Sequence, residues 1–194
     1  KRYPVSSGIA MDNKFMVLQH GFDEDDCSNQ PVVRPLLEES KIKFLYAGSM
    51  YVGIESALDS FAKSLVQIRL RNPSIFHRLQ IDFYTDTVQY QRVFKESKLD
   101  VVRFHKPVGS SEYFSKIGET DFIILFLAFP WNLNLTTKVV EALPFRKRLL
   151  AFSEQSPVTE FIRSNRIGSV IYPDQNIVEA FLSIINDYVT GQDN

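Results

Sequence analysis

The residues best suited to chemistry lie close together, between positions 136 and 141. Thr136 and Thr137 supply two hydroxyls, and Lys138 follows them directly. Glu141 comes four residues after Thr137, on the same face of a helix. A helix N-terminus with a lysine beside it suits a phosphate, because its N–H groups are unpaired and its partial charge is positive. A carboxylate one turn further on can accept hydrogen bonds from two adjacent ribose hydroxyls, so a ribose joined to a diphosphate fits this spacing.

A strand, a helix and a second strand must position these residues. The apolar run 122–127 leads through the helical pattern at 136–143 into a second apolar run, 149–152. Apolar runs without alternation are typical of strands buried on both faces of a parallel sheet. Such sheets bind ligands beyond the carboxyl ends of their strands, which predicts a ligand edge near Thr136.

Strands and helices alternate in the same way along the rest of the chain. Apolar patterns predict further strands at 14–19, 42–47, 79–84, 101–104 and 169–172. Between the strands, apolar spacing predicts helices at 54–68, which Pro73 ends, at 87–97, and at 110–118, which Ser110 or Ser111 caps. Two more helices are predicted from caps. One begins at Ser156-Pro157, and the other begins at Asn176, where Glu179 completes a capping box. We therefore expect an α/β fold, a Rossmann-like doubly wound parallel sheet of about six strands with helices on both faces.

Composition limits the partners. The 194 residues are 44% hydrophobic, enough for one well-cored domain. Lys plus Arg number 22 against 23 Asp plus Glu, which gives no electrostatic reason to expect nucleic acid as a partner. No apolar run approaches the ~20 residues of a membrane helix, and no signal-peptide pattern is present. We expect a soluble, cytoplasmic protein.

Neither cysteine nor histidine predicts a metal site. Cys27 is the single cysteine, so a disulfide framework or a cysteine-based metal site cannot form within one chain, and a reducing compartment is favoured. His20, His77 and His105 are scattered without metal-ligand spacing. We predict that the protein binds no metal.

The beginning of the sequence differs from the remainder. It starts at Lys1 without a methionine, and the first forty residues hold one convincing strand. We interpret 1–36 as a hinge or linker segment and 37–194 as the regular domain. We also expect the sequence to be part of a longer protein.

With the elements placed, four segments carry a family resemblance. The sequence 20–26 is similar to a hinge motif, 44–51 to a first strand with its glycine loop, 138–143 to a Lys-x-x-Glu-x-Leu signature, and 167–174 to a closing Gly and Pro-x-Asp segment. In this order they resemble the C-terminal, donor-binding domain of GT-B glycosyltransferases, in the large retaining family that includes many bacterial polysaccharide assembly enzymes. The resemblance covers nearly the whole chain.

The resemblance implies that a nucleotide-diphosphate sugar binds as substrate, without a cofactor or a metal. It places the base against Pro107 and Val108, the ribose on Glu141, and the diphosphate between Gly48 and the helix start, where Lys138 stabilises the leaving group. The donor-binding residues implied are Gly48, Ser49, Tyr51, Pro107, Val108, Thr136, Thr137, Lys138 and Glu141.

The resemblance also implies what lies outside this domain. An N-terminal domain would hold a glycan or lipid-linked acceptor, so this domain alone would transfer nothing. The full-length enzyme would associate peripherally with a membrane.

The sequence departs from the family pattern in ways that favour an alternative. Leu133 stands where the first of two glutamates is expected, and the loop 49–54 lacks the Arg and Lys that often grip the diphosphate. The charge run 146–148 replaces a Gly-Lys-Pro segment and is more typical of a solvated connection. These departures favour a non-catalytic nucleotide- or partner-binding module. A hydrolase or epimerase would need an inward-facing acid or histidine group, which the pattern does not show.

Structural roles also remain open for the individual residues. Thr136 and Thr137 are ordinary N-cap candidates, and Glu141 can pair with Lys138 on a helix surface. Gly48 can serve a turn that needs positive φ, and it would also let a phosphate approach the backbone closely.

Overall fold

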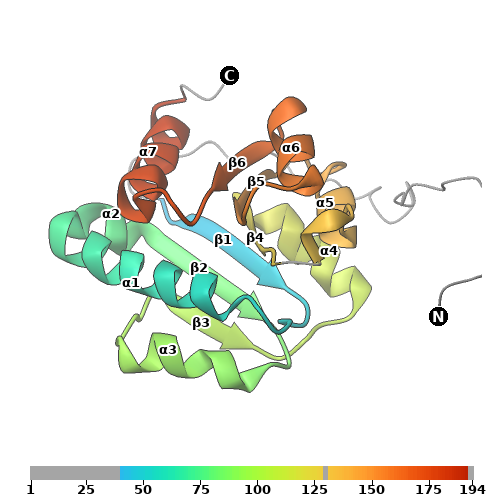
Figure 1. Cartoon of the computed structure of the whole chain (residues 1–194). Helices are drawn as coiled ribbons and strands as arrows, with labels where there is room; N and C mark the ends of the chain where they lie inside the picture. Colours follow the sequence, from blue (N-terminus) through green and yellow to red (C-terminus); the bar gives the residue numbers. More distant parts are fainter. Residues whose placement is uncertain (1–39, 129–130, 192–194) are drawn as a thin grey trace, which may run out of the picture.

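A computed structural model describes residues 40–128 and 131–191. The predicted strand at 14–19, the hinge motif at 20–26 and the whole proposed linker segment, 1–36, lie outside these residues. All six strands of the described part are parallel, in the order β3-β2-β1-β4-β5-β6 (Figure 1). The strands are β1 (Ile42–Ala47), β2 (Leu79–Tyr84), β3 (Val102–His105), β4 (Phe122–Phe126), β5 (Arg148–Phe152) and β6 (Gly168–Ile171). The predicted doubly wound sheet is confirmed.

Helices cover both faces of this sheet (Figure 1). The first face carries α1 (Glu55–Arg71), α2 (Pro73–Arg78), the 3-10 turn η2 (Val88–Tyr90), α3 (Gln91–Glu96) and α7 (Ile177–Thr190). The second face carries α4 (Ser110–Glu119), α5 (Thr137–Ala142) and α6 (Pro157–Ser164), and the 3-10 turn η3 (Trp131–Leu133) precedes α5. In the described part of the chain, no helix combines the length and apolarity needed to cross a membrane.

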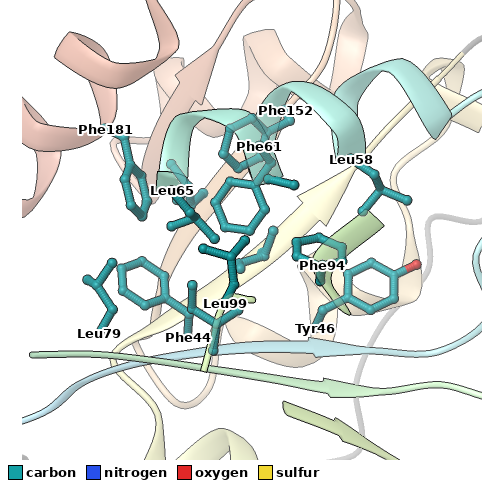
Figure 2. Packing of buried hydrophobic residues seen from close by; sticks show 14 of the residues in the cluster. Phe44, Tyr46, Leu58, Phe61, Leu65, Leu79, Phe94, Leu99, Phe152 and Phe181 are labelled. Atoms are coloured by element: carbon teal, nitrogen blue, oxygen red, sulfur yellow. The ribbon is translucent and has the colours of Figure 1, made fainter. Parts of the chain in front are cut away.

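The core of the first face is largely aromatic. Phe61 of α1 is fully buried at its centre, with ring centroids 5.1 Å from Phe152, 5.7 Å from Phe126 and 5.8 Å from Phe181 (Figure 2). Aromatic pairs at these separations add to the stabilisation that burial alone supplies. This face therefore fixes how α1 and α7 sit on the sheet.

The core of the second face is smaller and mostly aliphatic. It joins the alternate residues of β1, β4 and β5 to buried side chains of α4, α5 and α6. Towards β2 and β3 the same face becomes polar, because the strands there alternate. Asp82 and His105 pair across them at 2.7 Å, and the Tyr84 ring stacks on His105 at 4.5 Å. The second face is the one that offers polar groups beside the sheet.

Helix boundaries confirm some predicted caps. Ser156 forms a capping box with Thr159, and Pro157 occupies the first turn of α6, as predicted. The Asn176 side chain accepts from the N–H of Glu179 at the start of α7, also as predicted. The carboxylate of Glu179 contacts Arg71 at 3.3 Å, and a closed capping box is not formed there.

One expectation about helix ends was wrong, and another was confirmed but incomplete. Neither Ser110 nor Ser111 caps α4: Gly109 is the N-cap residue, and its carbonyl accepts from Tyr113 at 2.9 Å. Pro73 does more than end α1, because Asn72 caps a second helix, α2, that begins at this proline. A proline at the first helical position starts a helix as readily as it stops the one before.

Candidate functional site

The sheet has a topological switch point between β1 and β4. These neighbours pair in parallel at the centre of the sheet, yet the chain leaves β1 towards the first face and β4 towards the second. Connections that diverge in this way leave a crevice outside the carboxyl ends of the two strands, and open α/β sheets bind ligands there. The predicted ligand edge is this edge of the sheet.

A pocket of about 260 Å³ opens at this edge on the second face. We call it the donor pocket, after the ligand that the family resemblance implies. It is lined by Ala47, Gly48, Tyr84, Pro107, Val108, Ser110, Tyr113, Thr137, Lys138 and Glu141. Six of the predicted site residues are among them: Gly48, Pro107, Val108, Thr137, Lys138 and Glu141. They come from the loops after β1 and β3 and from α5, the helix that follows β4, so they are far apart in the sequence.

Gly48 and Lys138 fit closely against each other. Gly48 has φ +116°, and a Cβ at this position would lie 2.9 Å from Lys138 Cε and 3.1 Å from its Nζ. The N–H of Gly48 donates to the carbonyl of Tyr84 at 2.9 Å, which ties the end of β1 to the end of β2. Glycine is therefore favoured here by the backbone angle, and a larger side chain would displace the end of Lys138.

Lys138 is a largely buried cation. Its Nζ lies 5.0 Å from the centroid of the Tyr46 ring, which stabilises the charge through a cation–π contact. Burial lowers the pKa of Lys138, and the charge of Glu141 opposes this shift. An anionic group in the pocket would favour the charged form, so the site is suited electrostatically to a phosphate.

Glu141 has a partner that its sequence position does not reveal. Burial raises the pKa of Tyr113, and the charge of Glu141 and a hydrogen bond with it raise that pKa further. The hydroxyl of Tyr113 therefore lies near the Glu141 carboxylate, and both side chains line the pocket. A carboxylate has about four acceptor sites, so Glu141 retains capacity for ligand hydroxyls.

Three predicted site residues do not line the donor pocket. The carbonyl of Ser49 accepts from the Tyr46 hydroxyl at 2.9 Å, and Tyr51 has 45% of its surface exposed. Thr136 is the N-cap residue of α5, but its side chain makes no cap bond, and its Oγ1 is buried without a partner among the described residues. Thr136 therefore occupies the N-cap position of α5 without capping the helix through its side chain.

The prediction missed three lining residues with informative side chains, Tyr84, Ser110 and Tyr113. The alternation of β2 carries a usable signal for Tyr84: Leu79, Ile81 and Phe83 are buried in the first-face core, so Tyr84 must point to the second face. Ser110 and Tyr113 reach the pocket because α4 packs beside β1, which is a tertiary contact.

The described residues also bear on two further features. No group of three or more His, Cys, Asp or Glu side chains among them could hold a metal ion. Leu133, at the position of the expected first glutamate, has 47% of its surface exposed in the turn η3.

No family model matches the chain, and no curated protein matches it. Solved structures do match its fold. An E. coli structure described as trehalose-6-phosphate bound with UDP-2-fluoro glucose aligns with a TM-score of 0.59 and 8% identity, over 88% of this chain and 44% of that one. The fold is that of one half of a GT-B glycosyltransferase.

Two other GT-B structures agree with this assignment of the fold. Sucrose-phosphate synthase from Thermosynechococcus elongatus has a TM-score of 0.56 and 13% identity, over 80% of this chain and 37% of that one. A glycosyltransferase from Rickettsia africae has a TM-score of 0.56 and 16% identity, over 78% and 38%. This chain spans less than half the length of each of these three structures. The match is consistent with the C-terminal half of the GT-B fold.

Proposed function

We propose that this chain binds a nucleotide-diphosphate sugar in the donor pocket and forms the donor-binding half of a glycosyltransferase. One observation carries the proposal. Six residues that the family resemblance assigned to donor binding, from three separate segments, line a single pocket at the switch point of a GT-B sheet.

The diphosphate would bind between Gly48 and Lys138. The lysine is buried and preorganised over Tyr46, so a phosphate oxygen would meet a cation that needs no large rearrangement. Charge that develops on a leaving diphosphate is stabilised strongly by such fixed groups in a water-poor site. We propose that Lys138 stabilises the charge of the leaving diphosphate and that the transfer needs no metal.

The nucleoside would occupy the other end of the pocket. Glu141, oriented by the hydroxyl of Tyr113, would accept hydrogen bonds from the ribose, and the base would lie against Pro107 and Val108. Uridine is the first base to test, because the matched E. coli structure holds UDP-2-fluoro glucose and another matched structure is an S. aureus MnaA–UDP complex.

Exposed apolar residues around the same edge support a second domain facing the pocket. Tyr51, Val52, Val88 and Leu133 are 45%, 80%, 71% and 47% exposed, and all four follow the carboxyl ends of strands. Isolated domains rarely leave several large apolar side chains exposed at one place without a partner surface. In this proposal the second domain holds a glycan or lipid-linked acceptor, and transfer with retention of configuration requires both domains.

Calorimetric titration of the protein with UDP, GDP, ADP and CMP tests the donor site. We expect one nucleoside diphosphate to bind selectively, and Glu141→Ala to raise its dissociation constant about tenfold or more, since a hydrogen bond to a charged group contributes roughly 1.5–3 kcal/mol. Glu96→Gln, a surface change on α3 beside Arg92, is the matched control and should leave binding unchanged. Equal affinity for all four nucleotides, or an unchanged constant in Glu141→Ala, would contradict the proposal.

A non-catalytic nucleotide-binding module is the second candidate. The exposed Leu133 favours it, because a leucine cannot hydrogen-bond a sugar hydroxyl from the position where the family carries a glutamate. Product analysis of the full-length protein with its preferred nucleotide-sugar separates the two. Sugar transfer or sugar-nucleotide cleavage supports the enzyme, whereas tight binding without turnover supports the module.

A further inference from the structure

A second cleft lies at the opposite end of the sheet from the donor pocket. We call it the three-arginine cleft, after Arg148, Arg163 and Arg166. It has a volume of about 490 Å³ and is also lined by Phe122, Gly168, Ser169, Val170 and Ile184. Phe122, Arg148 and Gly168 are the first residues of β4, β5 and β6, so the cleft is at the amino ends of these strands.

The lining of the cleft is strongly positive. Its three arginines are accompanied by the Ser169 hydroxyl, and no Asp or Glu is among the described residues that line it. The carboxylate of Asp121, next to Phe122, already accepts from the Tyr188 hydroxyl and from the N–H of Lys43, each at 2.7 Å. Within the described residues, the wall of the cleft therefore presents three guanidinium groups and no carboxylate.

One of the arginines is held by the core. The Arg148 guanidinium lies 4.6 Å from the centroid of the Tyr188 ring of α7, in a cation–π contact. Stacking fixes the plane of the guanidinium. The side chain then loses little further conformational entropy when a ligand binds, because its N–H donors are already oriented. Arg148 thus contributes a positioned positive charge at the base of the cleft.

The other two arginines lie at its mouth. Arg163 is in the last turn of α6, its Nη1 lies 3.5 Å from the Tyr172 hydroxyl, and Arg166 follows in the exposed turn before β6. Cations at a helix C-terminus are ordinarily explained by the helix dipole, which is a small effect. That explanation does not reach Arg148, which belongs to β5 and faces the cleft from another direction.

The edge of the sheet gives the cleft its shape. Within the described residues β6 pairs with β5 alone, and Gly168 lies so close to β5 that a Cβ would be 2.1 Å from the Leu149 carbonyl oxygen. The wall formed by Phe122, Val170 and Ile184 is apolar. The volume exceeds what a bare phosphate ion needs, and the apolar wall suits the organic part of a larger ligand.

We propose that the three-arginine cleft binds a phosphate ester, at a site separate from the donor pocket. Guanidinium groups match phosphate oxygens with paired hydrogen bonds, which makes arginine the preferred residue for this recognition. The phosphate ester belongs either to a free phosphorylated small molecule or to the headgroup of an anionic phospholipid. The inference does not depend on the function proposed for the donor pocket.

Two binding assays test the proposal and separate the two sources. Calorimetry with glycerol 3-phosphate measures a free phosphate ester, and cosedimentation with phosphatidylglycerol vesicles, against phosphatidylcholine vesicles, measures the lipid. We expect binding in one of these assays and a loss of at least about tenfold in the double variant Arg163→Gln, Arg166→Gln. Both side chains are exposed, so the variant should fold, as a thermal unfolding curve would verify.

Three controls make the result specific. Lys63→Gln with Arg92→Gln removes the same charge from surface pairs on α1 and α3 and should leave binding intact. Lys138→Met, in the donor pocket, should also leave it intact, and the arginine variant should bind nucleotides as the wild type does. Absence of binding in both assays, an equal loss in the surface control, or loss in Lys138→Met would overturn the proposal.

Discussion

The two faces of the sheet are built differently. The first face is a continuous aromatic core in which Phe61 contacts rings from the sheet and from α7. The second face has a smaller aliphatic core, a polar region over β2 and β3, and the donor pocket. The comparison teaches that the larger core lies on the first face, while the second face combines a smaller core with a partly buried lysine and a carboxylate.

The largest expected effect tests the stabilising face. Phe61→Ala removes a fully buried ring and should lower the free energy of unfolding by about 3–5 kcal/mol. Urea denaturation followed by circular dichroism measures it. Among molecules that remain folded, nucleotide affinity should change little, because Phe61 does not line the donor pocket. A loss of affinity as large as the loss of stability would show that the two faces are not separable.

A smaller effect is expected at Gly48. Gly48→Ala places a Cβ against Lys138 at a positive φ and should lower stability by roughly 1–3 kcal/mol while weakening nucleotide binding. Gly53→Ala is a matched control: its φ is +103°, and its Cβ would be 3.3 Å from Ala128 and away from the lysine. Thermal unfolding should show a loss in both variants, and calorimetry should show weaker binding in Gly48→Ala alone. Equal binding losses would assign the effect to backbone strain.

The smallest effect is a pH dependence caused by Lys138. Because burial lowers its pKa, the unfolded chain binds more protons than the folded one between the lowered pKa and the ordinary lysine value. The free energy of unfolding should therefore gain a contribution as pH rises through this window, and Lys138→Met should lack it. Nucleotide affinity should change in the opposite sense, since a neutral lysine attracts a diphosphate poorly. Matched pH series on wild type and Lys138→Met measure how the free energy of unfolding and the nucleotide affinity each change with pH. Identical slopes in the two proteins would show that Lys138 does not cause the pH dependence.

Much of the sheet could be predicted from local pattern. The apolar runs of β4 and β5 and the alternation of β2 appear in the structure within one residue of their predicted bounds. The caps at Ser156 and Asn176 were predictable because a cap bond spans only three residues. The end of α1 before Pro73 was predicted, but the second helix that begins at this proline was not. The cap at Ser110 was wrong, because several neighbouring residues could cap α4 and packing selects among them.

The candidate site, too, combines residues that the local sequence predicts with residues that only tertiary contacts bring together. Gly48, Lys138 and Glu141 were predictable because their motifs are local and follow strands whose ends must share one edge. Tyr113, which lies near Glu141, and Tyr46, whose ring faces Lys138, could not be assigned these roles, because each contact joins two elements far apart in the chain. The three-arginine cleft was hidden for this reason too, since Arg148 belongs to a charge run that is typical of a solvated connection.

The sequence by itself determined the class of fold and the order of its strands along the chain, and it predicted the edge of the sheet at which a ligand would bind. These depend on hydrophobic period and on turn chemistry, which act over a few residues. Only the tertiary structure decided which side chains meet: that Lys138 is buried against Gly48, that Ser49 and Tyr51 lie outside the pocket, and that three arginines share a cleft. Such contacts depend on how the helices pack on the sheet, and this packing is determined by all the side chains of the core together.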